Sequence, residues 1–305
     1  MGLHYHETEP GRQNARPERC YRMKVAIQGE PGSFSHEAAG KMTPGAEIVT
    51  CALSAEVFAL LASGGVDAAV IPIENSLAGS VLEHFDLLLE HDVRVTAEMP
   101  LRIRHNLIGV PGVQLEEIER VLSHPVALAQ CRRFFARHAG MKAVAFYDTA
   151  GSVKQVMEAR DRRSAAIASG AAAQQYGAAV LEAEIEDNPE NYTRFFLVRR
   201  TAEAAADKAA SRMSVAFSLE NRPGSLGSAL NELSAMGTNL TKIESRPVQG
   251  KPWEYVFYVD CQIGSSEEGA RALDALRRHC GMVKELGRYR ETAGSLEQAG
   301  GSRSS

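Results

Sequence analysis

Apolar and polar positions alternate along the first third of the chain in a way that predicts short buried strands separated by helices. The segment lengths, with strands of four to six residues and helices of seven or more, support this assignment. Strands that alternate with helices are typical of a mainly parallel sheet covered on both faces. Ser54 is positioned to cap the second helix. The expected strands are 24–28, 47–50 and 68–73, and the expected helices lie at 36–42 and 54–61.

The same kind of pattern restarts after residue 93. Residues 93–103 are interpreted as an extended crossover, and His124 or Ser123 is expected to cap a helix that runs from Pro125 to about His138. The chain then returns through residues 187–198. Two α/β lobes joined by crossing segments would leave a cleft between them, and such lobes often close around a small ligand. The expected strands of this second unit are 106–110, 121–122, 144–147 and 165–168.

A different pattern begins after residues 199–212, which are rich in Ala and charged residues and are interpreted as a linker. Residues 214–219 and 253–261 alternate between apolar and polar, whereas 223–233 and 267–279 have the apolar spacing of amphipathic helices. With further strands at 239–247 and 282–286, the order is βαββαβ, which is ferredoxin-like. The predicted fold class is therefore α/β, two-lobed, with a ferredoxin-like C-terminal domain.

Composition excludes several classes of protein. The chain has 305 residues, of which 44% are hydrophobic and 24% charged, and a formal net charge of −4. These values give no electrostatic case for nucleic acid binding, and no apolar run approaches a membrane span. The five cysteines are widely spaced and favour free thiols in a reducing compartment. We expect no metal, no cofactor and a cytoplasmic protein, with a disordered leader over 1–22 and a disordered tail over 291–305.

Three loops carry candidate chemistry. The stretch 187–198 joins a polar loop to a buried strand and holds a hydroxyl, a guanidinium and an aromatic pair at residues 193–196. Residues 29–35 form a Gly/Pro/Ser loop before a helix, which is a suitable anion site because backbone N–H groups converge there. Residues 74–80 follow the third strand at the carboxyl end, where ligands bind in parallel sheets. For residues 187–198 the alternative is an ordinary edge strand with an exposed Arg. For residues 29–35 the alternative is a plain turn.

Taken together, these stretches resemble prephenate dehydratase followed by an ACT regulatory domain. The strings that carry the resemblance are 29–35, 72–76 with 79–81, 123–125 with 130–131, 191 with 193–195, 223–226 and 240–247. Val126 and Ser225 depart from the residues common in the family, Gln and Ala. The resemblance implies a catalytic domain over 23–200 similar to periplasmic solute-binding proteins. Lobe 1 would be about 23–100 and 186–200, lobe 2 about 101–185, the linker 201–212 and the ACT domain 213–290.

The resemblance implies conversion of prephenate to phenylpyruvate, water and carbon dioxide, a step in phenylalanine biosynthesis. Thr193 is expected to hydrogen-bond the leaving hydroxyl group. Arg194 is expected to clamp a carboxylate or to form a salt bridge with Glu74 or Asp187. Glu74 would be an acid if its pKa is raised, or would orient Arg194. The expected substrate-binding residues are Asn75, Ser76, Ser123, Gln130, Phe195 and Ser33.

The ACT resemblance implies phenylalanine as a feedback inhibitor and a homodimer or homotetramer. The expected phenylalanine-binding residues are Asn221, Pro223, Gly224, Ser225, Leu226, Asn239, Leu240, Glu244, Ser245, Arg246 and Pro247. Backbone groups near Gly224 would suit its carboxylate. Three alternatives remain open: an arogenate dehydratase, a pure binding protein and an amino-acid-sensing regulator.

Overall fold

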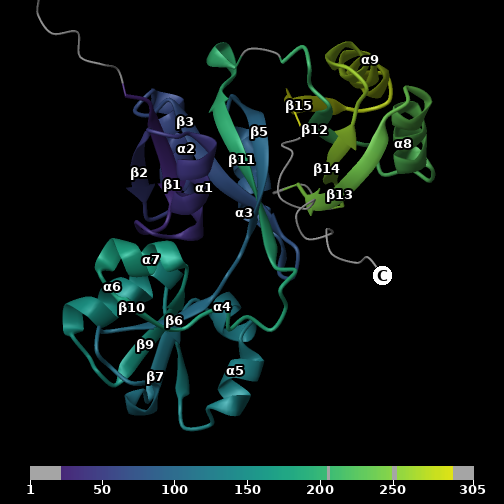
Figure 1. Cartoon of the computed structure of the whole chain (residues 1–305). Coiled ribbons are helices and arrows are strands. Elements are labelled where there is room, and N and C mark those ends of the chain that lie inside the picture. The colour runs from purple at the N-terminus through teal and green to yellow at the C-terminus, as the bar shows by residue number, and fades with distance from the viewer. Residues whose placement is uncertain (1–21, 205–206, 249–252, 291–305) are drawn as a thin grey trace, which may run out of the picture.

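The computed structural model describes residues 22–204, 207–248 and 253–290 as two α/β lobes and a C-terminal domain (Figure 1). The expected tail, 291–305, and all of the expected leader except Arg22 lie outside the described residues. Within the described ranges, no helix is long and apolar enough to cross a membrane.

Lobe 1 is built on a six-stranded sheet in the order β2-β1-β3-β11-β5, with β4 paired to β3. The strands are β1 (Lys24–Gln28), β2 (Glu47–Cys51), β3 (Ala68–Asn75), β4 (Gly79–Ser80), β5 (Val93–Arg102) and β11 (Tyr192–Arg200), and the helices are α1 (Phe34–Met42), α2 (Ser54–Ser63) and α3 (Leu82–Glu90). Only β1, β2 and β3 are parallel, and β11 runs antiparallel to both β3 and β5. The expectation of a mainly parallel sheet is thus wrong for half of this lobe.

Two local expectations in lobe 1 also change. Residues 93–102 are a long strand of the sheet, because β11 returns beside them and pairs along their whole length. Ser54 is the first residue of α2 and does not cap it, since its hydroxyl bonds to side chains of Gln28 and His84. The carboxylate of Glu56 instead accepts hydrogen bonds from the backbone N–H groups of residues 52 and 53.

Lobe 2 holds a five-stranded mixed sheet in the order β10-β6-β9-β7-β8. Its strands are β6 (Asn106–Gly109), β7 (Arg120–Ser123), β8 (Lys142–Ala145), β9 (Ser164–Ala168) and β10 (Ala179–Glu182), and its helices are the 3-10 turn η1 (Leu115–Glu117), α4 (Pro125–Ala129), α5 (Arg132–Arg137), α6 (Thr149–Ala159) and α7 (Gly170–Tyr176). The predicted single helix over 125–138 is therefore two helices. His124 is the N-cap of the first of them.

One set of contacts between the lobes joins residues 30–32 of lobe 1 to residues 147–154 and 169–172 of lobe 2. The Ser169 hydroxyl at the start of α7 donates to the Gly32 carbonyl at 2.7 Å. A Cβ at Gly32 would lie 2.7 Å from Ala172 Cα, and its φ is +84°, so both the close approach and the backbone conformation favour glycine there. Tyr147 and Lys154 of lobe 2 reach Glu30 of lobe 1 at 2.9 and 3.3 Å.

After a short 3-10 turn, η2 (Thr201–Glu203), the C-terminal domain forms a four-stranded antiparallel sheet in the order β13-β14-β12-β15. Its elements are β12 (Arg212–Ser218), α8 (Ser225–Ala235), β13 (Asn239–Pro247), β14 (Tyr255–Gln262), α9 (Ser266–Arg277) and β15 (Met282–Tyr289). The order βαββαβ confirms the ferredoxin-like prediction. Helices α8 and α9 cover one face of this sheet and share a core with it.

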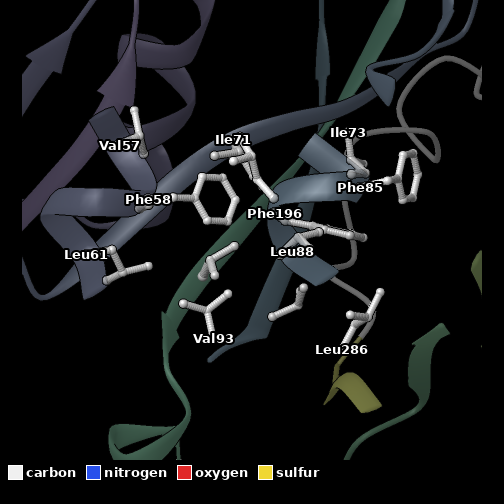
Figure 2. Close-up of a cluster of buried hydrophobic side chains, with 14 of the residues drawn as sticks. Val57, Phe58, Leu61, Ile71, Ile73, Phe85, Leu88, Val93, Phe196 and Leu286 are labelled. Carbon is white, nitrogen blue, oxygen red and sulfur yellow. The ribbon is translucent and has the colours of Figure 1, made fainter. Parts of the chain in front are cut away.

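The other face of the C-terminal sheet packs against lobe 1. One apolar cluster contains Phe58 of α2, Phe196 of β11 and Leu286 of β15, so the core of lobe 1 continues into the C-terminal domain (Figure 2). A Cβ at Gly287 would lie 2.2 Å from the carbonyl oxygen of Val95, which shows how closely β15 approaches β5. The two parts are therefore joined by a packed interface as well as by the linker.

Candidate active site

A hollow of about 450 Å³ lies between the lobes, and four of the predicted site residues line it. They are Asn75 at the end of β3, Thr193 and Phe195 on β11, and Gln130 from lobe 2. A neighbouring hollow of about 400 Å³ is lined by a fifth, Ser33. The two spaces share the residues Phe34, Ser35, His124, Asp148 and Thr149, so they form one continuous cleft.

The Thr193 hydroxyl is positioned by its cross-strand neighbour. Asn75 and Thr193 are paired in the β3–β11 ladder, and Asn75 Nδ2 lies 3.0 Å from Thr193 Oγ1. The orientation of the Asn75 amide is fixed, because its Oδ1 accepts hydrogen bonds from the backbone N–H groups of residues 77 and 78. Nδ2 is therefore the donor, and the Thr193 oxygen accepts. The hydroxyl hydrogen of Thr193 remains available for a ligand in the cleft.

Four further hydrogen bonds connect this pair to lobe 2. Asn75 Nδ2 also donates to Asn191 Oδ1 at 2.8 Å, and Asn191 Nδ2 donates to Gln130 Oε1 at 2.9 Å. Gln130 Nε2 completes a ring with Asn75 Oδ1 at 3.4 Å. His105 Nε2 lies 2.9 Å from Gln130 Oε1, which already accepts from Asn191, so the imidazole carries its hydrogen on Nε2. Amides from both lobes thus share one network beside Thr193.

His105 was not predicted from the sequence. It is 2% exposed, lines the cleft beside the Phe34 ring, and its Nδ1 has no hydrogen-bond partner among the described residues. Burial lowers the pKa of His105, although Gln130 and Glu186 act in the opposite direction. A single histidine between two strands belongs to no motif, and its position in the crossover between the lobes is the one signal that could have identified it.

Gln130 reaches the network because the helix breaks at that residue. Gln130 caps the end of α4, and α5 starts two residues later. Asp187, on the segment that returns to lobe 1, accepts from the backbone N–H groups of Arg132 and Arg133 at 2.9 and 2.8 Å, and its own N–H donates to the Gln130 carbonyl at 2.7 Å. Asp187 therefore starts α5 through its carboxylate and holds Gln130 in place through its backbone N–H.

Arg194 and Glu74 lie on the far side of the sheet from the cleft. The Arg194 guanidinium bonds to Glu74 at 3.3 Å, to Glu98 at 3.1 Å and to Asp260 of the C-terminal domain at 2.5 Å. Burial acts to lower the pKa of Arg194, but Asp260, Tyr289 and Glu98 together raise it. The expectation that Arg194 clamps a substrate carboxylate is wrong for this arrangement, because successive residues of a strand face opposite sides. The alternative, a salt bridge to Glu74, is present.

Two predicted substrate-binding serines are engaged elsewhere. Ser123 is fully buried, and its hydroxyl donates to the Ile167 carbonyl at 2.6 Å. The Ser76 hydroxyl bonds to the Glu190 carbonyl at 2.9 Å and accepts from the N–H of Tyr192 at 3.0 Å. Neither is among the residues that line the cleft. Both hydroxyls therefore hold the backbone near the site through hydrogen bonds.

The cleft is suited to anions through helix starts. Ser33 caps α1 and Asp148 caps α6, and the first residues of both helices line the cleft. Free backbone N–H groups and the helix dipole favour a carboxylate there. The lining residues of the two hollows include no Lys or Arg, and they include the carboxylates of Glu30 and Asp148. Burial raises the pKa of Asp148.

The described residues contain no group of His, Cys, Asp and Glu side chains that could hold a metal ion.

The predicted phenylalanine-binding residues fall into two separate places. Asn221, Ser225 and Leu226 line a small hollow of about 100 Å³ with Trp253 and Tyr255. Glu244 and Arg246, on β13, instead face lobe 1, where they bond to Ser80 and Asp86. One copy of the chain does not bring the two sets together.

Comparisons with known proteins agree with this architecture. The prephenate dehydratase family model matches residues 25–203, and the ACT domain model matches residues 213–278. The chain is 38% identical over 278 residues to arogenate dehydratase/prephenate dehydratase 2 of Arabidopsis thaliana, covering 88% of this chain and 73% of that relative.

Two solved structures superpose with a TM-score of 0.81 at 32% identity and cover 88% of this chain. One is prephenate dehydratase from Arthrobacter aurescens in complex with L-Phe, of which 90% is covered. The other, 98% covered, is described as GqqA, a novel type of quorum quenching acylase. The family expected from the sequence motifs is thereby confirmed, together with the fold of a two-lobed α/β catalytic domain followed by an ACT domain. The chain belongs to the prephenate dehydratase family and carries a C-terminal ACT domain.

Proposed function

We propose that this protein converts prephenate to phenylpyruvate, carbon dioxide and water. The observation that carries the proposal is the Thr193 hydroxyl, which lines the cleft and accepts from Asn75 Nδ2 at 3.0 Å. Its hydrogen is therefore free to be donated to the oxygen that leaves. Donors positioned where charge develops in the transition state are an effective catalytic device.

The reaction needs neither an oxidant nor a nucleophile. The bond between the ring and its carboxylate breaks, and carbon dioxide departs. The electron pair of that bond moves into the ring and expels the hydroxyl group on the opposite ring carbon. The leaving oxygen takes a proton and becomes water, and the ring becomes aromatic. A Thr hydroxyl is a weak acid, so Thr193 contributes a hydrogen bond while the proton is relayed from water.

The substrate carboxylates would be held by uncharged groups. The capped start of α1 at Ser33 and the amide of Gln130 offer N–H donors along the cleft, and Phe195 forms part of its apolar wall. Carboxylates bound by helix N-termini need no arginine partner. This assignment replaces the Arg194 clamp.

Feedback inhibition by phenylalanine at the ACT domain belongs to the same proposal. It is supported by the solved relative in complex with L-Phe. Because Asn221 and Glu244 lie in different places within one chain, we place the inhibitor between ACT domains of a homodimer or homotetramer in the cytoplasm. Residues of both sets would then meet across the interface.

Arogenate is the second candidate substrate. Several relatives, including one 38% identical, are named arogenate dehydratase. Arogenate carries an ammonium group where prephenate carries a ketone. The carboxylate of Asp148, in a cleft lined by neither Lys nor Arg, would favour that extra positive charge, whereas Glu30 already bonds to Lys154.

The test is a turnover assay of the purified full chain on prephenate and on arogenate, with Thr193→Val as the near-isosteric variant and Thr193→Ser as the matched control. We expect Thr193→Val to lower kcat by roughly two to three orders of magnitude and Thr193→Ser to retain most of it. Because of the acylase relative, hydrolysis of an N-acyl amide is measured in parallel. Absence of turnover on both dehydratase substrates, or full activity of Thr193→Val, contradicts the proposal.

A further inference from the structure

Strands β3 and β11 carry Asn75 and Thr193, the cleft pair. On the opposite face of the sheet they carry a second pair of residues, which we call the rear pair. In the β3–β11 ladder, Asn75 lies opposite Thr193, and the preceding and following residues, Glu74 and Arg194, also lie opposite each other. Because side chains alternate along a strand, one cross-strand pair faces the cleft and the other faces the ACT domain. Whatever fixes the rear pair therefore also fixes the backbone of the cleft pair.

The ACT domain forms an ion pair with each member of the rear pair, Glu74 and Arg194. Lys242 Nζ of β13 lies 2.8 Å from Glu74 Oε1, and Asp260 of β14 bonds to Arg194. The Lys242 and Asp260 side chains are 13% and 6% exposed. Removing Asp260 leaves an uncompensated charge in a largely buried ion pair, and removing Lys242 takes away a contact of Glu74, whose side chain is 35% exposed.

A third contact reaches a strand that contributes to the cleft lining. Ser80 is part of that lining and pairs with Glu74 in the β3–β4 hairpin, so its side chain lies on the same face of the sheet as Glu74. Its hydroxyl accepts from Lys242 Nζ at 2.8 Å and donates to Glu244 Oε2 at 2.7 Å. Lys242 therefore contacts two neighbouring strands of the catalytic sheet at once.

We propose that Lys242 and Asp260 of the ACT domain are positioning residues for the dehydratase reaction. Lys242 acts through Glu74 on Asn75, and Asp260 acts through Arg194 on Thr193. This inference rests on the proposed function and goes beyond it. The ACT domain supplies contacts that hold the catalytic strands, and a ligand that shifts β13 changes the geometry at Thr193. By linkage, a cleft ligand changes the affinity of the ACT domain for its effector by the same factor.

Four variants of the full chain test the inference: Lys242→Met, Lys242→Arg, Asp260→Asn and the control Arg94→Met. Arg94 forms a comparable contact with the ACT domain, 3.4 Å from Glu285, but at the other end of β5 from the cleft. We expect Lys242→Met and Asp260→Asn to lower kcat roughly tenfold or more with a smaller change in KM, because a small displacement of a catalytic group is costly. Lys242→Arg should recover part of the loss, and Arg94→Met should behave as the wild type.

Hydrogen exchange of the peptides that cover β3 and β11 gives a readout independent of turnover. Faster exchange in Lys242→Met and Asp260→Asn, but not in Arg94→Met, supports the inference even with a substrate still unidentified. A wild type inactive on prephenate and arogenate would count against the proposed function alone. If the wild type turns over and both variants match Arg94→Met in kcat and exchange, the inference is overturned.

Discussion

At the scale of single residues, the direction of one hydrogen bond decides whether Thr193 can act as a donor. Asn75 donates through Nδ2 to Thr193 Oγ1, while its Oδ1 is held by two backbone N–H groups. In Asn75→Asp, the oxygen that is held by the backbone stays and the donor becomes an acceptor. The Thr193 hydroxyl must then donate to the new carboxylate, and its hydrogen is withdrawn from the cleft.

We therefore expect Asn75→Asp to lower kcat on the order of a hundredfold, a loss comparable to that of removing the hydroxyl itself. The measurement is steady-state turnover of Asn75→Asp, Thr193→Val and the double variant. Because both changes remove the same hydrogen bond, the double variant should lose little more than either single variant. Independent, additive losses would show that Asn75 acts on the substrate and not on Thr193.

Thr193, Asn75 and Gln130 could be predicted from the sequence because each lies in one of the short stretches that resemble the family. It misplaced Arg194, although the alternation of a strand would have put neighbours 193 and 194 on opposite faces. What the sequence could not supply was which face meets the cleft, because that depends on where β5 and the ACT domain pack. His105 was missed for the same reason, since only the folded crossover brings it to Gln130.

At the scale of elements, the break between α4 and α5 depends on Asp187. Its carboxylate accepts from the N–H groups of Arg132 and Arg133. We expect Asp187→Ala to lower the free energy of unfolding by about 1 kcal/mol, the usual contribution of an N-cap. Asp187→Asn should lose part of this contribution, because Arg132 and Arg133 donate to different oxygens of Asp187 and the NH2 group of asparagine cannot accept a hydrogen bond.

Thermal unfolding of the two Asp187 variants is the measurement, and an Asp187→Ala variant as stable as the wild type would show that α5 does not depend on this cap. The break itself could not be read from residues 125–138, whose apolar spacing suits a continuous helix. The partner that ends α4 is about sixty residues away in the sequence, on a segment that returns from the other lobe. The mixed direction of the sheet has a similar origin, since β11 enters it only after lobe 2 is complete.

At the scale of the whole molecule, three partly or fully buried histidines set the response to acid. Burial lowers the pKa of His36, His84 and His105. His84 is fully buried, with Nδ1 against the Pro72 carbonyl and Nε2 against the Ser54 hydroxyl. The folded protein therefore keeps these imidazoles neutral at a pH where the unfolded chain, with a histidine pKa of about 6.5, already binds protons.

The sign of the effect follows from this difference. As the pH falls below about 6.5, the unfolded state takes up protons that the folded state refuses, so the free energy of unfolding falls by up to about 1.4 kcal/mol per pH unit for each histidine. Full stability is present above that pH. Carboxylates whose pKa is lowered, such as those of Asp161 and Asp207, lose their contribution only at more acidic pH.

Urea unfolding at about pH 7.5, 6.5 and 5.5 measures this response, and we expect the midpoint to drop most between the last two. His84→Gln is the matched variant, because its amide can replace both hydrogen bonds but cannot titrate. Its midpoint should depend on pH less steeply than that of the wild type, since one of the linked protons is gone. A wild-type midpoint equal at the highest and lowest of these pH values would mean that the histidines are not held neutral. An unchanged slope in His84→Gln would assign the response to the other two.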